Sequence, residues 1–208
     1  MKLIILGKPG SGKGTQAETI SKKLRIPQIA TGEILRGIER QKTALAKLIK
    51  SRIDKGLFIP DKLAAQITFN RLKKKDCKKG FILDGFPRNV NQARMLDKKF
   101  KIDKVIYLDV PDSLIVKRLS SRRECYCGMV YNMITNPPKR DEVCDKCGRK
   151  LYRRKDDAPE TIKKRLKIYN KMTRPVVGFY RKKKILAKVD GSQEIKKVSN
   201  EAMKKIIA

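Results

Sequence analysis

The sequence predicts an α/β fold in which five parallel strands form a sheet with helices on both faces. Five short apolar runs alternate along the chain with segments of helical spacing, at 1–6, 26–30, the start of 80–88, 104–110 and 185–189. Such alternation is typical of parallel sheets, because each helix crosses back over the sheet to the next strand. Ligands of these sheets lie at the carboxyl ends of the strands. Polar segments follow three of the strands, at 7–15, 84–88 and 190–191.

The first strand is followed by a glycine-rich loop. Gly7 and Gly12 bracket four residues, Lys13 follows directly, and the usual hydroxyl comes one position late, at Thr15. The backbone N–H groups of such a loop and the positive end of the next helix bind phosphate oxygens, and Lys13 adds a point charge near the β and γ phosphates. An ordinary glycine-rich turn is the alternative. The apolar strand before the loop and the helix expected after it, at 16–24, favour a phosphate site.

The second strand leads into a region of helices. A helix that begins at Thr31, with this residue as its cap, is expected to continue through 34–55 and to end at Gly56. After a turn, Asp61 is expected to cap a helix over 62–75.

The second half of the chain continues the alternation around one exception. Helices are expected at 91–100, from 111–112 to about 122, from 159–160 to about 183, and at 192–207. Residues 123–157 have no helical or strand periodicity and contain cysteines, a Pro-Pro pair and many charges. A small inserted module is therefore expected there.

Composition limits the class of protein. The length of 208 residues favours one domain with insertions. No apolar run reaches about eighteen residues and no secretory signal is present, so a cytoplasmic location is expected. With 53 Lys and Arg against 21 Asp and Glu, the net charge of +32 favours anionic partners, namely nucleotides, nucleic acid or an anionic surface. The basic residues are scattered, which also suits a solvated lysine-rich surface.

Four of the five cysteines lie within the insert. Cys144 and Cys147 are separated by two residues, so both thiolates can reach one tetrahedral ion. Cys125 and Cys127 are separated by one residue, which still supplies two thiolates but requires a different turn. Structural zinc is favoured over free or disulfide-linked cysteines. Cys77 stands apart and is expected to be a small buried residue.

At this point the chain resembles the adenylate kinase family. The resemblance rests on segments that occur in the family's order and spacing over nearly the whole chain: 7–15, 31–36, 84–88 with Gln92, 122–123, 154–157 and 189–191. The glycine loop combined with Asp-Gly-Phe-Pro-Arg at 84–88 is a highly specific pairing, and the late hydroxyl at Thr15 is also the family's pattern.

The resemblance implies a P-loop NTPase-type fold with two inserts. The core would comprise 1–29, 60–121 and 158–208, the nucleoside monophosphate-binding insert 30–59, and the lid 122–157. It implies reversible phosphoryl transfer from MgATP to AMP, giving two ADP. The cofactors would be Mg²⁺ with ATP and a structural Zn²⁺ in the lid. The chain would be a monomer that binds no membrane and no specific nucleic acid.

The resemblance also implies roles for individual residues. The catalytic residues would be Lys13, Arg88, Arg118, Arg122, Arg123, Arg154 and Arg165. ATP would bind to Gly10, Ser11, Gly12, Lys13, Gly14, Thr15, Arg122, Val130, Tyr131 and Gln193. AMP would bind to Thr31, Arg36, Leu57, Phe58, Ile59, Gly85, Phe86, Pro87, Arg88, Gln92, Arg154 and Arg165. Asp84 would hold Mg²⁺ through water, the zinc ligands would be Cys125, Cys127, Cys144 and Cys147, and Asp156 and Asp157 would pair with arginines when the lid closes.

The chemistry of these residue types agrees with the implied reaction. Phosphoryl transfer requires two polyanions in line, exclusion of water and stabilisation of the transferring charge, and arginine forks suit phosphate oxygens. A single surface arginine is more commonly a solvated charge, but Arg88 follows a strand-end loop, which favours function. A Gln side chain such as Gln92 can both donate to and accept from an adenine edge.

Two other functions remain open from the sequence. One is a kinase for a different monophosphate, such as UMP or CMP, against which the long lid and Gln92 argue. The other is a basic RNA-associated protein that uses the P-loop structurally. Its expected signature is aromatic residues interleaved with basic ones on strands, and the aromatic residues here lie mostly in apolar contexts.

Overall fold

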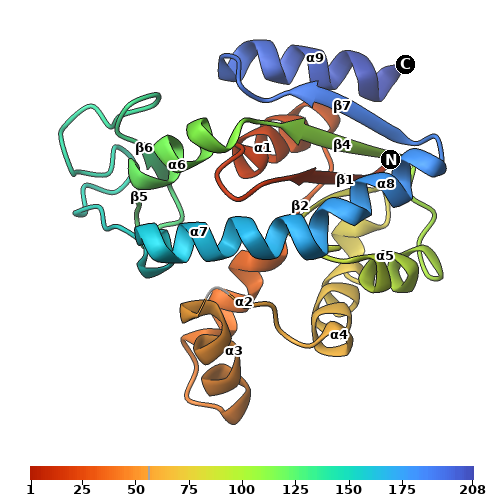
Figure 1. Cartoon of the computed structure of the whole chain (residues 1–208), viewed down its shortest axis with the longest axis horizontal. Coiled ribbons are helices and arrows are strands. Elements are labelled where there is room, and N and C mark those ends of the chain that lie inside the picture. The colour runs from red at the N-terminus through yellow and green to blue at the C-terminus, as the bar shows by residue number, and fades with distance from the viewer. Residues whose placement is uncertain (56) are drawn as a thin grey trace.

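A five-stranded parallel sheet forms the centre of the protein in the computed structural model, which describes residues 1–55 and 57–208, Lys155 by its backbone only (Figure 1). Its strands are β1 (Lys2–Gly7), β2 (Gln28–Ala30), β3 (Phe81–Asp84), β4 (Lys104–Asp109) and β7 (Leu186–Asp190). Their order across the sheet is β2-β3-β1-β4-β7, and every neighbouring pair is parallel. The predicted fold class is confirmed, and all five predicted strands are present.

Alternate residues of the central strand enter two separate apolar cores. Leu3 and Ile5 of β1 pack with α1 (Lys13–Leu24) and α9 (Ile195–Ile207). Ile4 and Leu6 pack on the opposite face, which is covered by the helices α4 (Asp61–Leu72), α5 (Val90–Asp97) and α8 (Arg174–Lys182). A strand buried on both faces has a continuous apolar sequence, and this explains the run that opens the chain.

The single helix expected over 34–55 is wrong. The chain instead forms α2 (Thr31–Glu39) and α3 (Ala44–Asp54), which pack against each other and project from the core (Figure 1). The hydroxyl oxygen of Thr43 accepts a hydrogen bond from the Ala46 N–H at 3.1 Å and so caps a new helix. The expected end at Gly56 lies outside the described residues.

Two predicted helix caps are also wrong. Ala30 is at the N-cap of α2, and Thr31 is the first helical residue, its buried hydroxyl having no hydrogen-bond partner among the described residues. Pro60 is at the N-cap of α4, and the carboxylate of Asp61 accepts hydrogen bonds from other elements instead of from its own helix. Long-range partners therefore replace the local bond in the case of Asp61.

The region of the predicted insert contains a small antiparallel hairpin. Its strands are β5 (Arg122–Glu124) and β6 (Val130–Asn132), extended by isolated bridges such as Glu124 to Tyr152. Three residues are too few for a strand period to be visible in the sequence. The hairpin follows α6 (Asp112–Ser120), and one-turn 3₁₀ helices occur at Lys75–Cys77 and Lys155–Asp157.

The long helix expected after the insert is interrupted. It consists of α7 (Pro159–Ile168), a π-helical turn (Tyr169–Thr173) and α8. Pro175 has no N–H to donate to the carbonyl four residues earlier, and its ring clashes with that carbonyl in a regular helix. A π turn directly before it widens the helix at that point.

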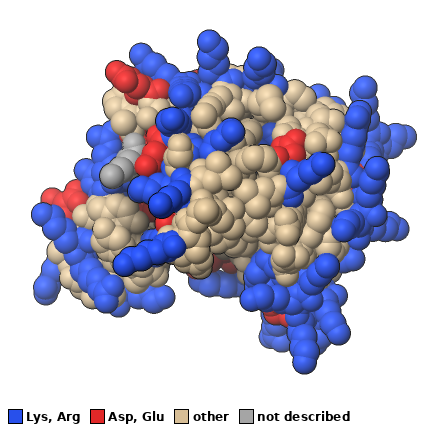
Figure 2. All heavy atoms as spheres, turned by 90° about the horizontal axis from the view of Figure 1, so that it is seen from below, with Lys and Arg blue, Asp and Glu red and all other residues tan. Residues whose placement is uncertain are grey.

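The charged side chains are spread over the surface. Figure 2 shows lysine and arginine distributed over one face, with few acidic groups between them. In the described part of the chain, no helix has the length and apolar character needed to cross a membrane.

Candidate functional site

The glycine loop joins β1 to the N-terminus of α1. Gly10 (φ 79°) and Gly12 (φ 88°) adopt left-handed backbone conformations that side chains disfavour. Gly12 is the N-cap of α1 and provides no capping side chain, so the first N–H groups of this helix are left for a ligand. A helix N-terminus presented in this way binds anions.

Lys13 lies within the loop that it follows. Its ammonium group donates hydrogen bonds to the carbonyl oxygens of Gly7 and Lys8, at 2.9 and 2.7 Å. Burial is the main cause that lowers the pKa of Lys13 to about 8; Asp84 opposes the shift, and Arg165 and other arginines contribute to it. Burial destabilises the charged form of this ammonium group, and an anionic ligand beside it would stabilise that form.

The loop opens into a cavity of about 1230 Å³ at the carboxyl ends of the strands. The cavity is lined by every residue that the sequence predicted to bind ATP, AMP or Mg²⁺, from Gly10 in the loop to Gln193 after β7. Arg123 is the one predicted catalytic residue that does not line it.

Two arginines converge on the side of the cavity formed by α2. A Cβ atom placed on Gly32 would lie 3.5 Å from a guanidinium nitrogen of Arg36 and 3.8 Å from one of Arg88. Burial lowers the pKa of both arginines, repulsion by Arg154 adds to the shift of each, and repulsion by Arg36 adds to that of Arg88. The Arg88 guanidinium also lies 5.0 Å from the centre of the Phe58 ring. Two neighbouring guanidinium groups that repel each other suit the binding of a doubly charged phosphate between them.

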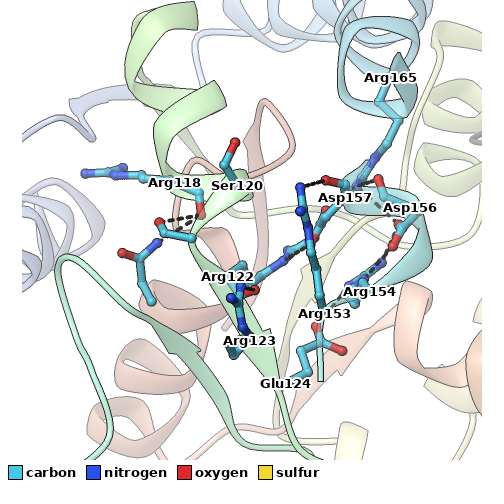
Figure 3. A network of polar contacts seen from close by, with 12 residues as sticks. Arg118, Ser120, Arg122, Arg123, Glu124, Arg153, Arg154, Asp156, Asp157 and Arg165 are labelled. Atoms are coloured by element: carbon cyan, nitrogen blue, oxygen red, sulfur yellow. Dashed lines mark hydrogen bonds and ion pairs between the residues drawn. The ribbon is translucent and has the colours of Figure 1, made fainter. Parts of the chain in front are cut away.

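The acidic partners of the arginines on the lid side are buried. Figure 3 shows Arg122, Arg154 and Arg165 around two aspartates that follow the lid hairpin. Arg122 contacts the fully buried Asp157 through two nitrogens, at 2.7 and 2.6 Å. Arg154 contacts Asp156 in the same bidentate manner, at 2.7 and 2.6 Å.

Arg165 connects the two aspartates. Its Nη1 lies 3.0 Å from the carboxylate of Asp157 and 3.1 Å from that of Asp156. Burial alone would raise the pKa of the Asp156 carboxyl, but the hydrogen bond from Arg154 and the charge of Arg165 hold this pKa well below its usual range. The Asp156 carboxyl is therefore charged at neutral pH.

Adjacent arginines of the hairpin diverge. Successive side chains of a strand point to opposite faces. Arg122 therefore points to the cavity, whereas Arg123 forms an ion pair with Glu142 at 2.8 Å, away from the cavity. Arg118 lines the cavity but points away from the aspartates (Figure 3), and its guanidinium donates to the carbonyl oxygens of Gly191 and Ser192 at 2.9 and 3.5 Å.

The side chain of Gln92 is already engaged within the protein. Its Oε1 accepts a hydrogen bond from the Arg88 N–H, and its Nε2 donates to Asp61, each at 2.8 Å. Hydrogen bonds from Asn91, Asn89 and Gln92 outweigh the effect of burial and lower the pKa of the Asp61 carboxyl. One amide hydrogen and one lone pair of Gln92 remain for a base.

The four cysteines of the lid region come together. Their sulfur atoms all lie within 4.8 Å of one another, with Cys125 and Cys147 at 3.4 Å and Cys127 and Cys144 at 3.6 Å. A tetrahedron of Zn–S bonds of about 2.3 Å has edges of about 3.8 Å, so the spacing fits one zinc ion. Tyr131 packs on this cluster, its hydroxyl 3.6 Å from the sulfur of Cys144.

The sequence analysis missed two acidic residues of the site. Glu124 is buried and contacts Arg154 at 3.0 Å, so it belongs to the charge network of the lid. Its place directly after Arg122 and Arg123 was the available signal. Asp61 was taken for a helix cap, and nothing in the local sequence indicates that it holds Gln92.

Comparisons with known proteins agree on one family. The adenylate kinase family profile matches residues 5–185. The chain is 48% identical to the adenylate kinase of Caldicellulosiruptor bescii, with 98% of each chain covered. It is 49% identical to that of Archaeoglobus fulgidus (97% of this chain, 95% of the relative) and 48% identical to that of Clostridium acetobutylicum (95% of each). The phosphate loop, the converging arginines and these similarities over nearly the whole length have one explanation: the chain belongs to the adenylate kinase family.

Proposed function

We propose that the protein catalyses the reversible transfer of the γ-phosphoryl group of MgATP to AMP, giving two ADP. The observation that carries this proposal is one cavity with two separate cationic ends. The glycine loop and Lys13 form one end, and Arg36 and Arg88 form the other. A kinase that joins two nucleotides needs a phosphate site for each of them within one water-excluding space.

Each end has a distinct task in this reaction. The loop N–H groups and Lys13 bind the β and γ phosphates of ATP, and the pair Arg36 and Arg88 fixes the acceptor phosphate of AMP. Arg122 and Arg165 face the region between them and offset the charge on the transferring group. Arg118, Arg123 and Arg154 are proposed as further phosphate ligands on the lid side; of these, Arg123 would have to leave Glu142.

We propose that less charged parts of the cavity bind the adenine bases of the two nucleotides. Thr31, Gln92 and the backbone of 57–59 line the AMP end, and the free donor and acceptor of Gln92 suit an adenine edge. Val130, Tyr131 and Gln193 line the ATP end. We therefore favour AMP over UMP or CMP as the acceptor.

Mg²⁺ fits at Asp84. This carboxylate follows β3 and lines the cavity beside Lys13, and burial raises its pKa, a shift that a nearby cation opposes. Mg²⁺ keeps several waters in protein sites, so Asp84 would hold it through water. When bound, the ion neutralises charge on the ATP phosphates.

We further propose three functional units: a core (1–29, 60–121 and 158–208), a monophosphate-binding insert (30–59) and a lid (122–157). The pair α2 and α3 projects from the core (Figure 1), and residues of the hairpin of β5 and β6, such as Arg122 and Tyr131, line the cavity. The four thiolates of the lid would bind structural Zn²⁺, because four thiolates leave no open coordination position for a catalytic water.

A panel of acceptor nucleotides tests the function. In a coupled assay of ADP formation with MgATP, we expect AMP to be used at a kcat/KM far above those of UMP and CMP. Equal use of UMP or CMP would assign a different base selectivity. Tight RNA binding on filters, with no ADP formed from any monophosphate, would instead support the RNA-associated alternative.

Replacing Arg88 tests the acceptor site. We expect Arg88→Lys to keep the charge but lose the planar fork, so that kcat/KM for AMP falls at least about tenfold, equivalent to about 1.4 kcal/mol. Arg71→Lys is the matched control, since the guanidinium of this arginine binds the carboxylate of Asp76 in a bidentate manner and does not line the cavity. Steady-state kinetics with AMP varied measure both variants, and unchanged kinetics of Arg88→Lys would remove Arg88 from the site.

Proton uptake tests the role of Lys13. Its pKa of about 8 in the free protein means that about half of the chains hold a neutral Lys13 at pH 8. A phosphate ligand raises this pKa, so MgATP binding at pH 8 should take up about half a proton, and affinity should fall as pH rises above 8. Calorimetry in two buffers of different ionisation enthalpy measures the uptake. It should be absent in Lys13→Met, and its absence in the unmodified protein would contradict a phosphate contact.

Removal of a cysteine tests the lid metal. Elemental analysis should find one zinc ion per chain, and Cys144→Ser should lose it and melt at a lower temperature, because the lid has too small an apolar core to hold together alone. Some activity should survive at moderate temperature. Cys77→Ala, outside the cluster, should keep its zinc. A content of much less than one metal ion per chain would exclude the metal site. An unchanged melting temperature of Cys144→Ser would exclude a structural role for it.

A further inference from the structure

A hydroxyl on the π-helical turn contacts the loop that carries Arg88. The buried side chain of Thr173 donates a hydrogen bond of 2.8 Å to the carbonyl oxygen of Arg88, a residue 85 positions away in the sequence. Both residues line the cavity. The bond therefore joins the helix after the lid to the proposed AMP end of the site.

This bond differs from the usual behaviour of a helical hydroxyl. Serine and threonine in helices commonly donate to the carbonyl four residues earlier. Among the described residues, four hydroxyls form such bonds, in Thr19, Thr68, Ser120 and Ser121. The hydroxyl of Thr173 instead donates to a residue of another element.

The difference occurs at the π-helical turn. The carbonyl oxygen four residues before Thr173 belongs to Tyr169, and it accepts the N–H of Arg174. This is the wider hydrogen bond of a π helix, and the turn directly precedes Pro175. The Tyr169 carbonyl oxygen is thus aligned with the N–H five residues later, unlike a carbonyl of an α helix, and the Thr173 hydroxyl donates to a distant acceptor.

The backbone of Arg88 is fixed on both sides. Its N–H donates to Oε1 of Gln92 at 2.8 Å, and its carbonyl oxygen accepts the Thr173 hydroxyl. Its side chain is held as well, because the Arg88 Nε donates to the carbonyl oxygen of Gly85 at 2.8 Å. Loss of the Thr173 contact would free the carbonyl side of this residue, and the guanidinium moves with the backbone that carries it.

We propose that Thr173 is a positioning residue that fixes the Arg88 backbone so that the Arg88 guanidinium meets the phosphate of the acceptor nucleotide. This inference rests on the proposed role of Arg88. It assigns to the π-helical turn a part in acceptor binding, as opposed to stability alone. A positioning role predicts a selective loss, since the Lys13 end of the cavity has no contact with Thr173 among the hydrogen bonds of the described residues.

The test compares Thr173→Val, which removes the hydroxyl at nearly constant shape, with Thr173→Ser, which keeps it. We expect Thr173→Val to raise the KM for AMP about fivefold, equivalent to about 1 kcal/mol, the usual worth of one hydrogen bond. The KM for MgATP should change less than about twofold. Thr173→Ser should have a KM for AMP close to that of the unmodified protein. Thr68→Val is the matched control, because it removes a fully buried helical hydroxyl that lies outside the cavity.

A double-mutant cycle separates this inference from the proposed function. If Thr173 acts through Arg88, Thr173→Val should have no further effect on the KM for AMP in an Arg88→Ala background. A lowered melting temperature with an unchanged KM for AMP, or equal effects of Thr173→Val and Thr68→Val, would overturn the positioning role. Normal AMP kinetics of Arg88→Ala would instead overturn the proposed function. If Thr173→Val does not fold, calorimetric titration of Thr173→Ala and Thr173→Ser with AMP makes the same comparison.

Discussion

Crowded positive charge in one cavity is the constraint on which the rest of the structure depends. Lys13 at the start of α1, Arg36 on α2 and Arg88 in the loop after β3 are brought together, and burial penalises the charge of each. Charged groups tolerate burial only when they are paired or solvated. Buried carboxylates beside the cavity offset part of this positive charge. The charge that they leave unpaired favours the binding of anionic ligands.

The carboxylates are distributed according to this need. Asp84 lies beside Lys13 at the end of β3, and Asp156 and Asp157 hold the arginines on the lid side. A bidentate contact fixes the plane of each guanidinium as well as its position. Arg122 and Arg154 are thus held at the cavity, Arg122 by the fully buried Asp157 and Arg154 by Asp156, which also lines the cavity. Their remaining donors are those proposed to bind phosphate oxygens.

The helical segment from α7 to α8 connects the two ends of this charge distribution. Arg165, on α7, contacts the aspartates after the lid hairpin, and Thr173, at the end of the π-helical turn, contacts the backbone of Arg88. One continuous helical element therefore touches the lid network and the loop after β3. Arg165 and Thr173 are about two helical turns apart. Because a helix is stiff over this length, a movement of the lid that displaced Arg165 would also displace Thr173.

The periodicity and composition of the sequence determined a large part of this description. The five strands, their parallel arrangement and the glycine loop follow from apolar runs and glycine spacing, which are local properties of the chain. The four cysteines were predicted as a group because thiolates at short spacing share one ion, and the structure brings them together. The candidate cavity residues also came from the sequence, through strand-end position and resemblance to the family.

The tertiary structure alone decided which neighbour takes which role. Arg122 and Arg123 are adjacent residues of the same type. Because successive side chains of β5 point to opposite faces, Arg122 points to the cavity and Arg123 to Glu142. Asp61 was expected to cap its own helix, but Asn89, Asn91 and Gln92 are closer partners in the folded chain. The hydroxyl of Thr173, at the end of a π turn, donates to the carbonyl oxygen of Arg88 and not to a carbonyl of its own helix. In each case the competing partner is distant in sequence, and a local pattern carries no information about a contact that only folding creates.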